Sequence, residues 1–229
     1  MESLGSRGGT PITSQYHSLY KLGGVGLIAY GSFVLAGAFI DQATGPPPPT
    51  PADILAWVNT HERLVAFPSE LLFFEAAFLV PGTAALYHGL APTVKATTVV
   101  GCGMLAIAIS VMALLAVVHG RLAYPVYGIR IRTPDVAAFA VSLYYGGLHA
   151  ISLLLGSAII CLGLAMNRGV CGKRIAYFGF VTGPVAIVGG YPYAIGSTAT
   201  LFCQAVVAAW FVAAGATLYR PRCKRGSAP

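Results

Sequence analysis

Long apolar stretches alternate with short polar ones along the whole chain. Six of the apolar stretches are long enough to cross a bilayer core of about 30 Å, which takes about 20 residues of helix. The strands of a membrane barrel would alternate apolar and polar residues, whereas these stretches are continuously apolar. The pattern therefore predicts an all-α fold, a polytopic membrane protein with a bundle of six transmembrane helices. The predicted spans are residues 21–41, 65–88, 97–119, 136–166, 175–193 and 199–219.

The polar stretches divide the chain into three parts. We expect residues 1–20 to be an N-terminal cytoplasmic segment that is disordered at its start, residues 21–220 to be the transmembrane domain, and residues 221–229 to be a basic cytoplasmic tail. The longest loop, residues 42–64, is predicted to be exterior and contains four consecutive prolines. After them, Thr50 suits the N-cap and Pro51 the first position of a short helix on the membrane surface.

Composition and charge agree with a membrane location. The chain is 56% hydrophobic and 9% charged, whereas a soluble domain carries about a quarter charged residues. Of the 14 lysines and arginines, ten fall on the side of the predicted bundle where the termini lie. Because positive residues accumulate in cytoplasmic loops, both termini are predicted to be cytoplasmic in a multi-pass cell-membrane protein. No basic stripe with interleaved aromatic residues lies outside the termini, so no nucleic-acid partner is expected.

The sequence lacks the common signals of a cofactor. A bis-histidine haem needs two histidines at one depth, and His88, His119 and His149 fall at three different levels of the predicted spans. The sequence contains no C-x-x-C pair and no glycine-rich phosphate-binding motif. We therefore expect no cofactor and no metal site.

Two glutamates stand in the apolar stretch PSELLFFEAAFLVPG, residues 68–82. Glu70 lies within about two helical turns of the predicted exterior surface, where it can reach interfacial water. Glu75 lies deeper, about 10–15 Å below the start of the span. A carboxylate there costs about 2.5 kcal/mol or more, so Glu75 must face the bundle, be protonated or have a partner.

The fourth predicted span offers a partner for Glu75. Tyr145 and His149 lie on one small and polar helical stripe together with Ser142 and Gly156, and such stripes are typical of helix contacts in membranes. We expect Glu75 and His149 to share a polar pocket in the outer half of the bundle, directly or through one water. In the alternative interpretation, His149 only donates to a neighbouring carbonyl. Two further polar residues have outer-half positions, Gln204 on the last span and His119 at the end of the third, where it is either a site residue or an interfacial anchor.

The order of these features resembles that of bacterial six-span integral membrane proteins of unknown function. The resemblance is carried by HERLVAFPSELLFFEAAFLVPGTAALYHGL, residues 61–90, and by SLYYGGLHAISLLLGSAIICLGLAMNRG, residues 142–169. It implies a fold and a topology, and it assigns no activity and no functional residue.

Three functional hypotheses follow from these residues. The first is a small membrane-embedded enzyme that acts on a lipophilic substrate by acid–base chemistry, because ionisable groups that are buried together have perturbed proton affinities. Its predicted catalytic residues are Glu75 and His149, and its predicted substrate-binding residues are Tyr145, Gln204, Glu70 and His119. The second hypothesis is a transporter with a proton or solute pathway past Glu75. The third is a structural or accessory membrane subunit. The expected partners are the lipid bilayer, a lipophilic small molecule, and a second copy of the chain or a larger membrane complex.

Overall fold

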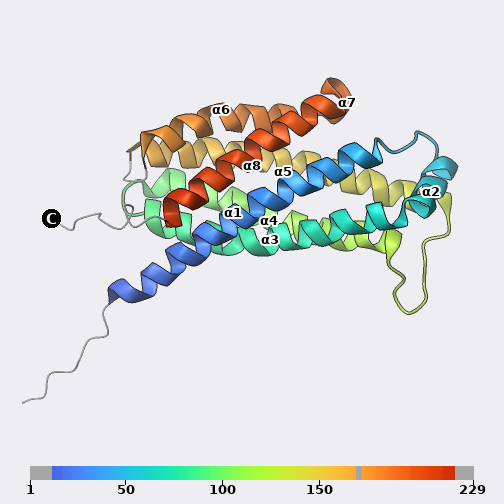
Figure 1. Cartoon of the computed structure of the whole chain (residues 1–229), viewed down its shortest axis with the longest axis horizontal. Coiled ribbons are helices and arrows are strands. Elements are labelled where there is room, and N and C mark those ends of the chain that lie inside the picture. The colour runs from blue at the N-terminus through green and yellow to red at the C-terminus, as the bar shows by residue number, and fades with distance from the viewer. Residues whose placement is uncertain (1–11, 169–171, 220–229) are drawn as a thin grey trace, which may run out of the picture.

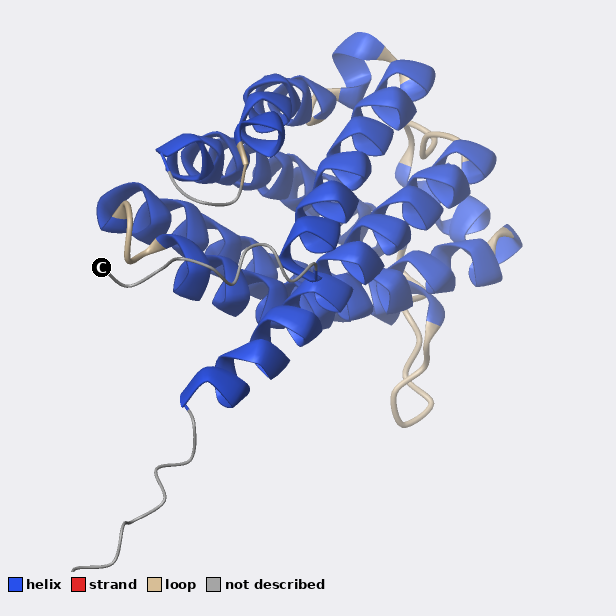
Figure 2. Cartoon of the chain, turned by 60° about the vertical axis from the view of Figure 1, so that its left-hand side comes forward, coloured by secondary structure: helices blue, strands red, loops and turns tan. Residues whose placement is uncertain are grey.

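The computed structural model describes residues 12–168 and 172–219, and the regular secondary structure of this part is helical (Figures 1 and 2). It consists of α1 (Ile12–Thr44), α2 (Pro51–Thr60), α3 (Glu62–Leu90), α4 (Lys95–Ala123), α5 (Pro134–Arg168), α6 (Lys173–Gly189), α7 (Pro192–Ile195) and α8 (Ser197–Tyr219). The all-α class predicted from the sequence is confirmed for this part of the chain.

Five of the six predicted spans lie within single helices, and most helices run past the predicted limits. The first helix begins at Ile12, inside the segment that was expected to precede it, and continues to Thr44. The fifth prediction was too long, because α6 ends at Gly189 and a separate short helix follows from Pro192. Gly189 and Gly190 have a low helix propensity, and Tyr191 disfavours the helical conformation because Pro192 follows it. These residues explain why the helix breaks at this point.

Five of the helices are long and apolar enough to cross a membrane by length and composition. They are α1 from His17 onward, α3, α4, α5 and α8. Helix α6 has 17 residues, or about 26 Å at 1.5 Å per residue, which is slightly less than a bilayer core. The chain therefore has the architecture of a helical membrane protein.

The six long helices form a closed ring. In order around it, α1 packs on α3, α3 on α4, α4 on α5, α5 on α6, α6 on α8 and α8 on α1. Large buried side chains fill its interior, among them Tyr30, Leu79, Leu162, Trp210 and Phe211. The ring is thus a packed bundle, with each helix held by two neighbours.

Helices α1 and α8 approach each other closely within the ring. A Cβ atom at Gly215 would lie 2.5 Å from the Gly24 carbonyl oxygen, and one at Gly24 would lie 2.8 Å from the Gly215 carbonyl oxygen. Only glycine fits at either position. Small residues let membrane helices pack backbone to backbone, which compensates for the missing hydrophobic force between helices in lipid.

One end of the bundle is covered by α2, and we call it the α2 end (Figure 1). The predicted cap of this helix is confirmed, since the Thr50 side chain accepts a hydrogen bond from the backbone N–H of Asp53 at 3.3 Å and Pro51 occupies the first helical position. Ile54 and Val58 of α2 pack on the start of α5 in a small apolar cluster. The start of α1 and the end of α8 lie at the opposite end of the bundle (Figure 1).

Helix α6 stops well before α5 reaches the α2 end. Its last residues lie beside the middle of α5, where a Cβ atom at Gly190 would meet Ser152 at 3.0 Å and His149 at 3.3 Å. The first turns of α5, from Pro134 to about Gly147, therefore extend beyond α6 toward the α2 end.

Candidate functional site

Glu75 lies on the buried face of α3, as its depth in the apolar stretch predicted. It is only 8% exposed and shares this face with Leu72, Ala76 and Leu79. Its carboxylate points toward α1 at Gly37, where an added Cβ atom would lie 3.8 Å from Oε1. An added Cβ atom at Gly37 would be in ordinary van der Waals contact with this carboxyl group.

Several ionisable side chains lie within electrostatic reach of Glu75. Its charge interacts with Asp41 and Tyr30 of α1 and with Tyr144 of α5. The charge of Asp41 also acts on Tyr145. Together with His119, we call these six residues, which come from α1, α3, α4 and α5, the carboxyl–tyrosine cluster.

His119 joins the carboxyl–tyrosine cluster through Tyr144. The two rings are stacked, with centroids 3.8 Å apart and planes inclined by 22°. His119 is only 5% exposed, so the structure places it inside the bundle and contradicts the interpretation of this residue as an interfacial anchor.

Two polar atoms of the carboxyl–tyrosine cluster are buried without a hydrogen-bond partner among the described residues, His119 Nδ1 and Tyr30 Oη. Buried polar groups are nearly always paired with protein, water or ligand, and an unpaired one costs about 1–3 kcal/mol. These two atoms are therefore the buried polar groups of the carboxyl–tyrosine cluster that form no hydrogen bond with another described residue.

His149 faces a different neighbour from the one that the sequence suggested. Its Nδ1 lies 2.7 Å from the Gly190 carbonyl oxygen, and its ring packs edge-on against Tyr191 with centroids 4.6 Å apart. Because a carbonyl oxygen can only accept, Nδ1 carries the proton and donates it. His149 thus satisfies one of the carbonyls left free at the end of α6.

No hydrogen bond joins Glu75 to His149 within the described part of the chain. The reason lies in the helical geometry of α5, because the five-residue offset from Tyr144 to His149 turns the side-chain direction by about 140° around the helix axis. Tyr144 therefore faces α4, while His149 faces α6. Only the second half of the predicted small and polar stripe faces α6, where a Cβ atom at Gly156 would meet the Gly183 carbonyl oxygen at 2.6 Å. Ser142 and Tyr145 lie in the first turns of α5, beyond the end of α6.

Of the other predicted substrate-binding residues, Tyr145 lies in the carboxyl–tyrosine cluster, while Gln204 and Glu70 lie elsewhere. The ring of Tyr145 meets Tyr144 edge-on at 5.3 Å. Gln204 lines, with Ser152 and Gly189, a hollow of about 10 Å³, which has room for about one water molecule. Glu70 is exposed and accepts a hydrogen bond from Tyr124 at the end of α4. Partial burial, together with the charge of Glu70 and this hydrogen bond, raises the pKa of the Tyr124 phenol.

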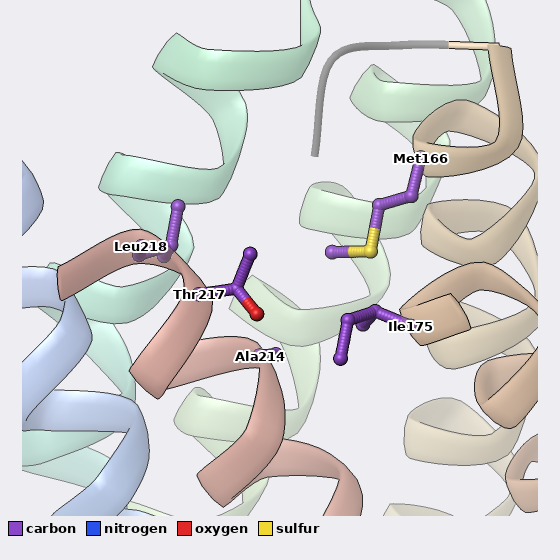
Figure 3. Close-up of a pocket in the computed structure, with 5 residues that line it drawn as sticks. All are labelled: Met166, Ile175, Ala214, Thr217 and Leu218. Carbon is purple, nitrogen blue, oxygen red and sulfur yellow. The ribbon is translucent and has the colours of Figure 1, made fainter. Parts of the chain in front are cut away.

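A second hollow lies at the end opposite α2. Met166, Ile175, Ala214, Thr217 and Leu218 line it (Figure 3), and it is too narrow for a water molecule. The Thr217 hydroxyl donates within its own helix to the Ala213 carbonyl at 2.8 Å. This hollow is a packing gap and offers no group for chemistry.

Sequence reasoning missed three members of the carboxyl–tyrosine cluster, Tyr30, Asp41 and Tyr144. A signal for two of them was present, because Tyr30, Val34, Gly37 and Asp41 repeat at helical spacing and so lie on one face of α1. The position of Tyr144 opposite His119 depends on how α4 packs on α5, and the sequence holds no comparable signal for it.

Across residues 12–168 and 172–219, no three His, Cys, Asp or Glu side chains are placed to hold a metal ion together. Comparisons with protein-family models, with curated proteins and with solved structures found no match for this chain. Its function is therefore inferred from the residues of the carboxyl–tyrosine cluster.

Proposed function

We propose that this chain is a membrane-embedded enzyme that performs acid–base chemistry on a lipophilic substrate at the carboxyl–tyrosine cluster. The observation that carries the proposal is the placement of the unpartnered Tyr30 Oη and His119 Nδ1 in the same cluster as the buried carboxyl group of Glu75. Glu75 is the proposed acid or base. His119, held in place by stacking on Tyr144, takes the partner role that the sequence suggested for His149.

The proposed topology is six spans with both termini in the cytoplasm of a cell-membrane protein. Two features support counting α6 as a span. It occupies a full place in the ring between α5 and α8, and it is flanked by Lys173 and Arg174 at one end and by Tyr191 and Tyr193 at the other. Such residues extend toward the lipid headgroups and compensate for a short apolar stretch. The α2 end then faces the exterior, and the cluster lies in the outer half of the bilayer.

Access to the cluster is proposed from the outer leaflet, between α1 and α5. Asp41 is exposed, although its charge acts on the buried Glu75 and Tyr144. Helices α1 and α5 are not neighbours in the ring, and α6 ends before this level. The surface of α5 beside Tyr145 is open, since a Cβ atom at Gly146 would meet no other atom within 4 Å. An amphiphile with its tail in lipid can approach the cluster with its polar head from this side.

Asp41 and Glu75 have complementary roles in this proposal. The charge of Asp41 acts on Glu75, and two carboxylates that repel each other bind one proton more readily than none. The exposed Asp41 exchanges protons with interfacial water, and the buried Glu75 delivers or removes one at the substrate.

A proton or solute pathway is the second candidate, because the exposed Asp41 and the buried Glu75 are two polar groups along a path from the surface into the bundle. Further inside, this path reaches Tyr30, whose ring packs edge-on against Phe211 with centroids 4.5 Å apart. Trp210 and Leu79 are fully buried in the same core. This apolar core favours a site that opens to one side, and therefore an enzyme over a conduit.

The test is photolabelling of the protein in lipid nanodiscs with a diazirine-bearing fatty acid. We expect labelling of peptides that contain Asp41 or Tyr145, and a carboxyl infrared band that shifts when the probe binds. Glu75→Gln should remove this shift and weaken labelling about 10–100-fold, which corresponds to one lost charge-assisted hydrogen bond of about 1.5–3 kcal/mol. Ser110→Ala, an exposed position on α4, is the matched control and should change neither signal. Labelling spread evenly over the lipid-facing surface and unaffected by Glu75→Gln would refute the proposal and favour an accessory subunit.

A further inference from the structure

The segment between α4 and α5, residues 124–133, forms a small hairpin. The backbone N–H of Ile129 donates to the Val126 carbonyl at 3.0 Å, and the N–H of Val126 donates back at 3.4 Å. The two residues at the turn have positive φ angles, 51° for Tyr127 and 78° for Gly128. This combination defines a type I′ turn, which matches the twist of two paired strands.

The 124–133 hairpin is fastened to the bundle at its base. The guanidinium group of Arg121, in the last turn of α4, donates to the carbonyls of Tyr124 at 2.9 Å and Ile129 at 3.0 Å. On the returning strand, Ile131 packs into the apolar cluster between α2 and α5. The hairpin is therefore held in one direction.

The tip of the 124–133 hairpin is apolar and uncovered. Tyr127 is 99% exposed and Ile129 is 67% exposed, and Val126 beside them is exposed as well. A tyrosine in the left-handed region is uncommon, because most non-glycine residues avoid positive φ. The turn thus accepts an unfavourable backbone conformation and presents its largest side chain outward.

Positive charge follows directly after the apolar tip. Arg130 and Arg132 are both exposed. Arg130 makes a long ion pair of 3.4 Å with Glu62, in which both side chains are about half exposed, and Arg132 forms no ion pair with another described residue. An apolar tip bordered by exposed cationic groups has the chemistry of a lipid-interface anchor.

The direction of the 124–133 hairpin matches this chemistry. Both views show it projecting away from the bundle and across the helix axes, rather than continuing along them (Figures 1 and 2). In a membrane whose normal follows the helices, it runs along the bilayer surface at the level where α4 ends and α5 begins.

We propose that the 124–133 hairpin inserts Val126, Tyr127 and Ile129 into the boundary between headgroups and acyl chains, while Arg130 and Arg132 bind lipid phosphates. The inference needs only that the long helices cross a bilayer, and it is independent of the chemistry at Glu75. Tyrosine at this boundary keeps its ring in the apolar layer and its hydroxyl in the headgroup layer.

The first test measures the depth of the tip with tryptophan fluorescence in nanodiscs. In Tyr127→Trp, we expect the added emission to be quenched by lipids that carry bromine near the headgroup end of the acyl chain, and to be protected from aqueous iodide. Pro49→Trp, in the exposed segment between α1 and α2, is the control and should show the opposite pattern. Quenching of the residue 127 signal by iodide, with no effect of brominated lipid, would overturn the proposal and leave the tip free for a soluble partner.

The second test concerns the two arginines. Spin-labelled phosphatidylglycerol should associate with the native protein more strongly than spin-labelled phosphatidylcholine, by about fivefold for each arginine near the phosphates. The double variant Arg130→Gln/Arg132→Gln should lose this preference, and Arg63→Gln, an exposed arginine on α3, should retain it. An unchanged preference in the double variant would refute the phosphate-binding role.

Discussion

Replacing His149 by alanine separates a structural role of this residue from a catalytic one. In the structure its Nδ1–H is bonded to the Gly190 carbonyl at 2.7 Å, and Gly190 is buried. Loss of the imidazole leaves a buried carbonyl unpaired, which costs about 1–3 kcal/mol. It also removes the edge-on ring contact with Tyr191, and such contacts contribute about 0.5–1.5 kcal/mol.

The two effects of His149→Ala add to a loss of about 1.5–4.5 kcal/mol in the free energy of unfolding. At 1.4 kcal/mol per factor of ten, the ratio of folded to unfolded protein should fall about 10–2000-fold. The lower end applies if a water molecule replaces the imidazole, because the neighbouring hollow of about 10 Å³ has room for one.

Thermal unfolding in detergent measures this loss, and amide hydrogen exchange locates it. For His149→Ala we expect a lower unfolding temperature and faster exchange in the last turn of α6, residues 186–190, with photolabelling at the carboxyl–tyrosine cluster retained. Ser152→Ala is the matched control, because the Ser152 hydroxyl bonds only to the Leu148 carbonyl of its own helix at 3.0 Å. If His149→Ala unfolds at the native temperature but loses photolabelling, then His149 belongs to the reaction and its capping role is refuted.

Two further predictions concern packing and topology. Gly215→Val should lower the free energy of unfolding by about 1–3 kcal/mol, because its Cβ atom would lie 2.5 Å from the Gly24 carbonyl oxygen. Gly103→Val, where an added Cβ atom meets nothing within 4 Å, should stay within about 0.5 kcal/mol in the same thermal assay, and equal effects would contradict the α1–α8 contact. In intact cells, a membrane-impermeant maleimide should label Thr44→Cys but not Gly226→Cys, and labelling of both would refute the proposed orientation.

The burial of Glu75 and the cap of α2 illustrate what local sequence can predict. A carboxylate deep in an apolar stretch cannot remain among acyl chains at low cost, so Glu75 had to face the protein, and it does. Thr50 and Pro51 combine a side-chain acceptor with a preset φ angle, and both properties depend only on neighbouring residues. These predictions succeeded because no other part of the chain enters them.

The pairing of Glu75 with His149 shows where such reasoning ends. The two residues were expected to meet because both are polar and lie at similar depths. In the structure His149 is instead bonded to Gly190, while Tyr30, Asp41 and Tyr144 lie within electrostatic reach of Glu75. The depth of a side chain in the membrane follows from its position along its own helix. Which partner it meets also depends on the direction in which it points around the helix axis, and that depends on where the neighbouring helices lie.

The sequence by itself determined that this is a helical membrane protein, where its helices lie, and that Glu75 is buried. Each of these properties follows from the apolar content of one stretch measured against the thickness of a bilayer. Only the tertiary structure decided that His119 joins the carboxyl–tyrosine cluster and that His149 caps α6. In lipid the apolar face of a helix has no preference for protein over acyl chains, so the rotation and partners of each helix are set by close packing. At Gly24 and Gly215 this packing depends on how the surfaces of two helices fit together, and the residues of one helix carry information about only one of these surfaces.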